Sequence, residues 1–296
     1  MEDVRDARPR IAAVVPCFND GATLEATLDS LRTQEPVELV VVDDGSDDPH
    51  TLELLSALEQ DGTKVVRQPN SGPAAARMAG VRATSAPFVF ALDADDLVAP
   101  GALTDLADAL DREEDAVMAW GDTQMIGDAT VHVPKARMLD PWQLTYVNPI
   151  PTASLIRRDA LESVGGWQLG SGYEDWDLWL AFAERGWRGV HVERTVARHR
   201  MHGARRWSED FARHTQIEDE LRRRHEPLYA QRRRNWRRSN APLRSRLLLP
   251  VVFRLPFVPH ATRFRLAVLV GNPIAVPRLW LQGRRARAAA TPADGR

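Results

Sequence analysis

The sequence has a single cysteine, Cys17, among 296 residues. One cysteine excludes an internal disulfide and is typical of a protein kept in a reducing compartment. The sequence also lacks an uninterrupted apolar run of about 18 residues, so we expect no membrane-spanning helix. Residues 1–9 mix acidic and basic side chains without an apolar stretch, which predicts a disordered N-terminus and no secretory signal. These absences favour a cytoplasmic protein whose only membrane contact would be peripheral, on the inner face of the plasma membrane.

Lysine is absent from residues 221–296, which hold 18 arginines and only two acidic residues, Glu226 and Asp294. The whole chain has 41 acidic and 39 basic side chains, so the part before residue 221 is acidic. We therefore expect a folded domain over residues 10–220 and a basic, helical extension over residues 221–296. The extension fits an anionic membrane surface, or packing against the acidic domain or a second copy; we do not expect it to bind nucleic acid.

Short apolar runs alternate with amphipathic stretches over the first half of the chain. The pattern predicts strands at residues 11–15, 37–42, 64–67 and 88–92, and helices at 22–32, 51–60, 73–83 and 100–112. Continuous apolar strands separated by helices predict an α/β fold with a Rossmann-like, mostly parallel sheet flanked by helices. The pattern loosens after Trp120, and residues 134–151, which contain four prolines, are predicted to be a loop or lid.

Polar clusters follow three of the predicted strands, where α/β sheets bind their ligands. They are Cys17-Phe18-Asn19-Asp20, Asp43-Asp44 and Asp93-Ala94-Asp95-Asp96. Carboxylate oxygens are the ligands that Mg²⁺ and Mn²⁺ prefer, and a carboxylate can also accept hydrogen bonds from a base or a ribose. The alternative is a pair of solvated acidic turns that cap the following helices, because Asp is favoured there as well.

Five motifs follow one another along residues 10–205. They are Val15-Pro16-Cys17-Phe18-Asn19, Val41-Val42-Asp43-Asp44-Gly45-Ser46, Asn70-Ser71-Gly72-Pro73-Ala74-Ala75-Ala76-Arg77-Met78-Ala79-Gly80, Asp93-Ala94-Asp95-Asp96, and Gly165-Gly166-Trp167 with Glu174-Asp175-Trp176-Asp177-Leu178. In this order they resemble glycosyltransferase family 2, with Met78 in place of the usual Asn. The resemblance implies a GT-A fold, with a nucleotide-binding half over residues 10–122 and an acceptor-binding half over residues 123–220.

On the donor side, the resemblance implies that Pro16, Phe18 and Asp44 line a nucleobase pocket, with Asn19 beside them among the donor-binding residues. Arg77 would lie near the nucleotide phosphates, where a guanidinium can pair with two oxygens at once.

For the sugar and the metal, the resemblance implies that Asp93 contacts the ribose or the sugar and that Asp95 ligates a divalent cation, Mn or Mg. His202 matches an R-x-H pattern that reaches the metal or the diphosphate, whereas His199 has no such match and is predicted to be structural or on the surface.

On the acceptor side, the resemblance implies that Asp175 is the general base, with Glu174 and Trp176 at the acceptor. Asp175 would remove the proton of an acceptor hydroxyl during in-line attack on the anomeric carbon, which inverts its configuration. The helix stripe that contains Trp176 has core-like spacing, so this indole belongs either in the core or against a sugar face. Asp177 is predicted to complement the charge of the helix N-terminus.

The function implied is that of an inverting glycosyltransferase, which moves a sugar from a nucleotide-diphosphate sugar to a glycan or lipid-linked glycan in the synthesis of cell-envelope polysaccharide. A non-catalytic nucleotide- or glycan-binding protein of the same fold is the alternative. A nucleotidyltransferase is disfavoured, because residues 16–20 lack the Gly-rich basic loop that holds a triphosphate.

Overall fold

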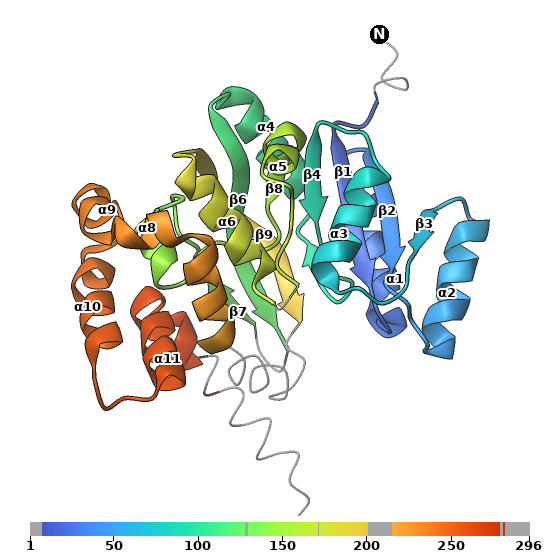
Figure 1. Cartoon of the computed structure of the whole chain (residues 1–296). Helices are drawn as coiled ribbons and strands as arrows, with labels where there is room; N and C mark the ends of the chain where they lie inside the picture. Colours follow the sequence, from blue (N-terminus) through green and yellow to red (C-terminus); the bar gives the residue numbers. More distant parts are fainter. Residues whose placement is uncertain (1–7, 128–129, 171, 201–214, 279–280, 282–296) are drawn as a thin grey trace, which may run out of the picture.

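The computed structural model describes residues 8–127, 130–170, 172–200, 215–278 and 281. In these residues a nine-stranded sheet has the order β3-β2-β1-β4-β8-β6-β9-β5, with β7 paired to β6 (Figure 1). The strands are β1 (Ile11–Cys17), β2 (Val37–Asp43), β3 (Lys64–Arg67), β4 (Phe88–Ala91), β5 (Leu97–Val98), β6 (Ala116–Ile126), β7 (Val131–Val133), β8 (Leu155–Arg157) and β9 (Arg188–Arg200).

The first half of the sheet is parallel, as the sequence predicts. β1 pairs in parallel with β2 and with β4, and β2 does so with β3. The apolar residues of β1 and β4 are buried, which is why these strands appear in the sequence as continuous runs rather than alternating patterns. The second half is mixed: β8 runs antiparallel to β4 and β6, whereas β9 runs parallel to β6.

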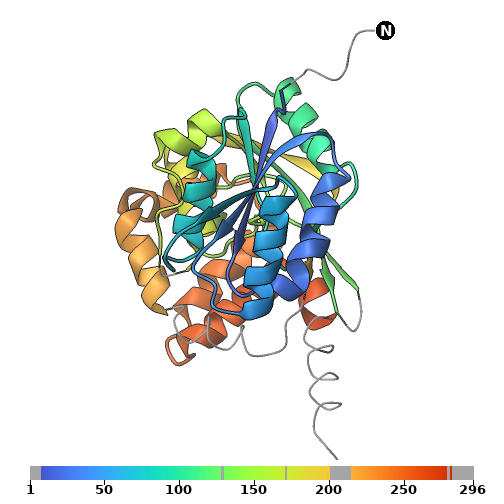
Figure 2. The same cartoon turned by 90° about the vertical axis from the view of Figure 1, so that its right-hand side faces the viewer.

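Helices cover both faces of the sheet (Figure 2). On one face, leucines of α1, α2 and α4 pack in one apolar cluster with side chains of β1 and β4. On the other face, α3 packs against alternate residues of β1 and β2, and α6 belongs to the same apolar cluster, which also contains Met118 and Trp120 of β6. These helices, with the short α5, are α1 (Gly21–Arg32), α2 (Pro49–Gln60), α3 (Pro73–Arg82), α4 (Ala102–Arg112), α5 (Arg158–Ser163) and α6 (Glu174–Glu184).

Local sequence signals account for two of these helices. Asp48 caps α2, because its carboxylate accepts the Thr51 amide (2.8 Å), and Pro49 occupies the first turn. α3 approaches β1 closely at Gly80, where an added Cβ would lie 2.3 Å from a methyl group of Val14. A glycine is therefore required there for α3 to reach the sheet.

The C-terminal region packs on the body through helices and through the proline-rich residues 134–151. Trp142 and Tyr146 of this stretch share an apolar cluster with Leu249 and Ala267, and η1 (Gln143–Thr145) is buried. The stretch is thus mostly a loop, as predicted, and its second half, from Leu139 to Val147, is largely buried against the C-terminal region. The C-terminal helices are a segment over residues 215–224, α8 (Glu226–Ala230), α9 (Arg232–Arg238), α10 (Leu243–Arg254) and α11 (His260–Gly271).

Within the described residues, no helix combines the length and the apolar character that crossing a membrane requires.

Candidate active site

The carboxyl ends of β1, β2 and β4 meet at one edge of the sheet, the lower edge in Figure 1. Cys17 at the end of β1 pairs with Asp43 at the end of β2, and the Asp44 amide donates to the Cys17 carbonyl (2.9 Å). Asp93 lies shortly after the end of β4, which pairs with β1 on its other side. The three polar clusters that the sequence places after strands therefore start from a common edge.

Asp44, a predicted nucleobase acceptor, is buried and organises the neighbouring loop. Its Oδ1 accepts hydrogen bonds from Gln68 Nε2 (2.7 Å) and the Ser71 amide (2.8 Å), and its Oδ2 accepts one from the Gly72 amide (2.8 Å). A carboxylate can accept about four hydrogen bonds, so capacity for one more partner remains. Asp44 thus connects the end of β2 to the turn that begins α3.

Phe18 and Asn19 follow β1 but differ in their surroundings. The Phe18 ring is 43 % exposed at this edge, and Pro16 before it is half-buried. The side chain of Asn19 donates to Asp47 Oδ1 (2.7 Å) and accepts the amides of Asp47 and Asp48 (3.0 Å each). Asn19 therefore joins the end of β1 to the loop after β2, and its predicted contact with the donor stays a prediction.

Arg77 joins the acidic turn after β4 to the start of α6. Its Nη2 lies 2.7 Å from Oδ1 of Asp93, and its Nη1 pairs with Glu174. The guanidinium is 2 % exposed and lies 6.0 Å from the ring centroid of Trp167. The residue predicted near the phosphates thus links the two halves of the site through two carboxylates.

Three carboxylates after β4 form a candidate metal centre. Asp93, Asp95 and Asp96 each offer an oxygen within 4.8 Å of the others, and this donor set fits a hard divalent cation. Asp96 is buried, and its oxygens also take the Arg200 amide (3.1 Å) and His199 Nδ1. Asp96 therefore ties this turn to the end of β9, which leaves Asp93 and Asp95 as the more accessible members.

The two histidines near the end of β9 have different outcomes. His199 has the structural role predicted for it, through its contact with Asp96. His202, the other predicted metal ligand, lies outside the described residues.

Asp175 lies in the first turn of α6 with its carboxylate held in place. Oδ2 accepts hydrogen bonds from Asn148 Nδ2 and Thr152 Oγ1, each 3.0 Å long, and Oδ1 accepts the Trp176 amide (2.7 Å). Nothing in the sequence signalled Asn148 or Thr152, because they lie in and just after the proline-rich stretch and meet Asp175 only in the folded chain. The carboxylate is therefore oriented before any ligand binds.

The electrostatic environment of Asp175 suits a base. Burial and the neighbouring Glu174 raise the pKa of Asp175 to about 6, although Arg77 acts in the opposite direction. Lys135 also acts electrostatically on Asp175, and burial lowers the pKa of this lysine to about 8. Asp175 is thus a stronger proton acceptor than an ordinary aspartate yet is still ionised at neutral pH.

Trp176 is a core residue, and this corrects its assignment to the acceptor. The indole is 2 % exposed, and its N–H donates to the Leu144 carbonyl (2.7 Å). Its ring stacks on Phe264 of α11, with 6.3 Å between the ring centroids. A ring enclosed in this way presents no face to a sugar, so Trp176 anchors the C-terminal helices to α6.

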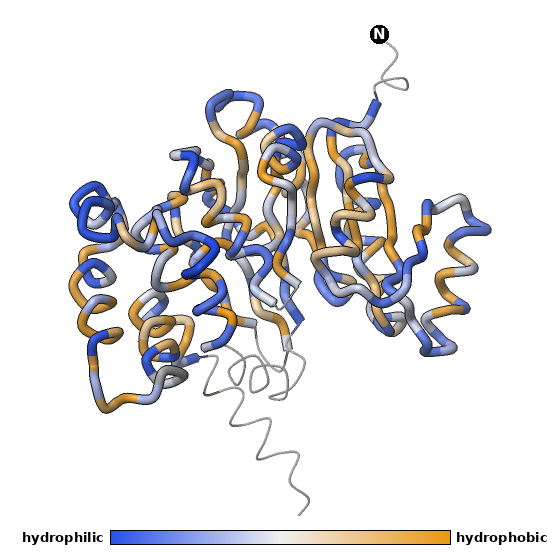
Figure 3. The backbone as a smooth tube through the Cα atoms, in the orientation of Figure 1, coloured by the Kyte–Doolittle hydropathy of each residue, from blue (hydrophilic) through white to orange (hydrophobic). Residues whose placement is uncertain are grey.

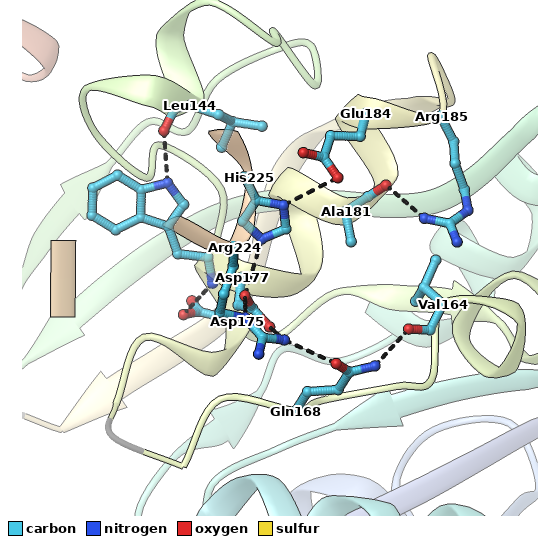
Figure 4. A network of polar contacts seen from close by, with 11 residues as sticks. Leu144, Val164, Gln168, Asp175, Asp177, Ala181, Glu184, Arg185, Arg224 and His225 are labelled. Atoms are coloured by element: carbon cyan, nitrogen blue, oxygen red, sulfur yellow. Dashed lines mark hydrogen bonds and ion pairs between the residues drawn. The ribbon is translucent and has the colours of Figure 1, made fainter. Parts of the chain in front are cut away.

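Asp177 anchors the C-terminal region rather than only complementing a helix end (Figure 4). Its carboxylate pairs with Arg224 Nε (2.7 Å) and His225 Nε2 (3.0 Å), and His225 Nδ1 lies 3.2 Å from Glu184. Burial favours the neutral histidine, but these two carboxylates raise the pKa of His225 overall. The acidic body and the basic C-terminal region are therefore paired in part, one of the alternatives that the charge pattern left open.

Residues 12–165 match the sequence model of the family described as glycosyl transferase family 2. Among curated proteins, an uncharacterized glycosyltransferase of Mycobacterium tuberculosis (strain H37Rv) is 28 % identical over 217 residues, covering 67 % of this chain and 92 % of its own. The succinoglycan biosynthesis protein ExoO of Rhizobium meliloti is 34 % identical over 109 residues, or 36 % of this chain and 31 % of the relative.

Two solved structures share the fold along most of the chain. S. aureus TarS 1–349 in complex with UDP-GlcNAc matches with a TM-score of 0.56 and 16 % identity, covering 95 % of this chain and 92 % of that one. The mannosyltransferase PcManGT from Pyrobaculum calidifontis, in complex with GDP-Man and Mn2+, matches with a TM-score of 0.54 and 18 % identity, covering 97 % and 77 %. The GT-A fold expected from the sequence is confirmed, with a helical C-terminal part.

Proposed function

The chain belongs to glycosyl transferase family 2 and is a glycosyltransferase, and from this premise we propose that it transfers a sugar with inversion from a nucleotide-diphosphate sugar to an acceptor hydroxyl. The observation that carries the proposal is the chain of contacts Asp93–Arg77–Glu174 beside Asp175. It sets a carboxylate suited to proton transfer next to an acidic turn suited to a diphosphate and its cation.

Asp175 is the proposed general base. Its Oδ2 is held by Asn148 and Thr152, and its raised pKa increases its affinity for the proton of an attacking hydroxyl. The hydroxyl oxygen bonds to the anomeric carbon as the bond from that carbon to the diphosphate oxygen breaks, and the proton passes to Asp175. Attack from the side opposite the leaving group inverts the configuration.

The donor is proposed to occupy the edge formed by the ends of β1, β2 and β4. Phe18 offers an exposed ring for stacking on a base, and Asp44 has capacity for one further hydrogen bond. Asp93 and Asp95 would hold a divalent cation, Mn or Mg, which when bound supplies positive charge to the departing diphosphate. The similar structures of TarS and PcManGT are complexes with UDP-GlcNAc and GDP-Man, respectively, which supports a nucleotide sugar as donor.

The acceptor is proposed to be a glycan or a lipid-linked glycan of the cell envelope, with Glu174 beside the base among its contacts. Relatives named for succinoglycan and minor teichoic acid biosynthesis support this class. A relative named as an undecaprenyl-phosphate aminosugar transferase, 34 % identical over 94 residues, supports a lipid-linked form. A lipid-linked acceptor lies at a membrane, so this choice requires the enzyme to work at the inner membrane surface.

The proposal is tested by measuring the melting temperature with each nucleotide diphosphate and nucleotide sugar, with and without Mn²⁺ or Mg²⁺. Ligands that bind the folded state raise the melting temperature by mass action, so one base should give a metal-dependent increase. Release of nucleotide diphosphate from that sugar donor then measures turnover. Binding without any turnover, with a panel of glycan acceptors present, would favour the non-catalytic alternative.

A further inference from the structure

Exposed apolar side chains are concentrated in the C-terminal region. Eight of the eleven large apolar residues exposed in the described part of the chain lie between residues 236 and 281. Leu243, Leu247 and Val251 of α10 recur at intervals of four and share one face of this helix, and Leu248 lies next to them. Figure 3 shows hydrophobic residues along α10 toward its connection with α11. A helix that faced only water would carry polar residues there.

The connection between α10 and α11 continues this apolar surface. Phe257 in the connection is 97 % exposed, which is the largest value among the exposed apolar side chains. Prolines stand at 256 and 259, so the segment that presents this ring is restricted in its backbone conformations. A fully exposed phenylalanine costs free energy in water unless another phase or partner covers it.

Arginines border the apolar surface without acidic partners. Residues 227–278 contain no Asp or Glu, and Arg233, Arg234, Arg237 and Arg238 of α9 are all exposed. α9 lies against α10, because Trp236 Nε1 donates to the Arg246 carbonyl (3.2 Å) and Arg246 lies 5.0 Å from the Trp236 ring. In the described residues none of these four arginines forms an ion pair, which leaves their charge available to an anionic surface.

The apolar surface lies on the same side of the molecule as the candidate active site. The connection between α10 and α11 extends below the sheet in Figure 1, the side on which the parallel strands end, and this vertical direction is kept in Figure 2. A flat surface touching Phe257 would therefore lie on the side where the strands β1, β2 and β4 carry their polar clusters.

We propose that α9, α10 and the α10–α11 connection form a docking surface for an anionic lipid bilayer. Leu243, Leu247, Val251 and Phe257 enter the headgroup region, and the α9 arginines pair with lipid phosphates. The charge favours this occupant over a second copy of the chain, because two such faces would bring their unpaired arginines together. Docking requires no sugar transfer, so it stands apart from the proposed reaction.

Cosedimentation of the full chain with vesicles tests the proposal. Binding should increase with the fraction of phosphatidylglycerol in phosphatidylcholine and should fall as salt is raised. Leu247→Gln combined with Val251→Gln should weaken the partition about tenfold. Each change of Arg233 or Arg237 to Gln should weaken it roughly fivefold.

The chain offers matched controls away from this surface. Leu52→Gln on α2 removes another exposed leucine, and Arg82→Gln on α3 removes an exposed arginine; neither should alter the partition. Nucleotide-diphosphate binding measured by melting temperature should be the same in all variants, which separates failure to dock from failure to fold or to bind donor.

Insertion itself is measured with a fluorophore at position 257. The wild-type cysteine, Cys17, is buried, so Phe257→Cys adds one accessible thiol for an environment-sensitive dye. Emission should shift to shorter wavelength with anionic vesicles, and the same dye at Leu52→Cys should not respond. Absence of vesicle binding at low salt, equal binding of the Leu247/Val251 variant, or a dimer that this variant dissociates would each overturn the proposal, as would binding of nucleic acid in preference to vesicles.

Discussion

Nη2 of Arg77 donates a 2.7 Å hydrogen bond to Oδ1 of Asp93, while Nη1 of the same guanidinium pairs with Glu174. One buried cation thus fixes the distance between the acidic turn after β4 and the first turn of α6. Because Asp175 follows Glu174 directly, the orientation of the proposed base depends on this pairing.

Replacement of Arg77 by lysine should separate charge from geometry. An ammonium keeps the positive charge but lacks the planar fork that holds two carboxylates, so we expect kcat/KM to fall about 10- to 100-fold, as for other partners of metal-site carboxylates. Arg82→Lys, at the exposed end of the same helix, is the control and should leave kcat/KM unchanged. Equal activity of Arg77→Lys and wild type would show that the link to Glu174 is dispensable.

Asp175→Asn should lose turnover and gain stability. Loss of the base should lower kcat by a factor of about 10² to 10⁴ without changing nucleotide-diphosphate affinity. The folded-state pKa of Asp175 is raised to about 6 from its ordinary value of 3.8, so stability falls as pH rises between these values and the full cost is present above about 6; asparagine removes that cost. We expect a higher melting temperature at pH 7.5 and no difference at pH 4. Near-normal turnover would rule out Asp175 as the base.

The pH profile should have its acidic limb near the pKa of Asp175. A general base must be ionised, so kcat/KM should fall as pH decreases below about 6. Thr152 donates to the carboxylate and thereby lowers its pKa, so Thr152→Val should move the limb to higher pH. Ser154→Ala, which removes a hydroxyl that donates to the Pro151 carbonyl and has no contact with Asp175 among the described residues, should not move it. A limb at the same pH in Thr152→Val and wild type would contradict this assignment.

Asp95 and Asp96 should differ although they are adjacent. Asp95→Asn should abolish the increase in melting temperature that Mn²⁺ adds to nucleotide-diphosphate binding, while leaving the ligand-free melting temperature unchanged. Asp96→Asn should lower the ligand-free melting temperature, because Asp96 is buried and ties its turn to His199 and the Arg200 amide. Removal of divalent cations by EDTA should reproduce the Asp95→Asn result in wild type. The reverse pattern would make Asp96 the principal ligand.

The strands and the polar clusters at their ends could be predicted because their signals are local. A continuous apolar run such as Ile11–Cys17 identifies a buried parallel strand wherever the rest of the chain lies. Parallel strands bring their carboxyl ends together, so the meeting of Asp44 and Asp93 at one edge followed as well.

The contacts that support the site could not be predicted, because each joins residues distant in sequence. Asn148 and Thr152 meet Asp175 from more than 20 positions away, and nothing in their own segment signals a partner. Trp176 has a spacing that fits both a core position and a sugar platform, and only the packing of Phe264 on its ring decides between them. The opposite net charges of the acidic domain and the basic C-terminal region predicted that the two attract each other, but not which side chains pair.

The pairing of Asp177 with Arg224 and His225 leads to a prediction for the stability of the C-terminal region. Asp177→Asn leaves Arg224 and the buried His225 without their shared carboxylate, and removing one partner of a buried pair costs about 3 kcal/mol in the free energy of unfolding. Glu193→Gln, which breaks an exposed ion pair with Arg137, is the control and should cost less than about 1 kcal/mol.

The same cluster should make stability depend on pH with a defined sign. The pKa of His225 is raised in the folded state, so its contribution is complete below about 6.5, its ordinary value, and is lost as pH rises through the folded-state pKa. The pKa of Asp177 is lowered, because the hydrogen bonds and charges of His225 and Arg224 outweigh its burial, so its contribution is lost only in acid. Urea unfolding of wild type and His225→Gln should therefore differ most below about pH 6.5, and the difference should shrink as pH rises above that value. A difference that stays constant across this range would mean that His225 is held by packing and not by its charge.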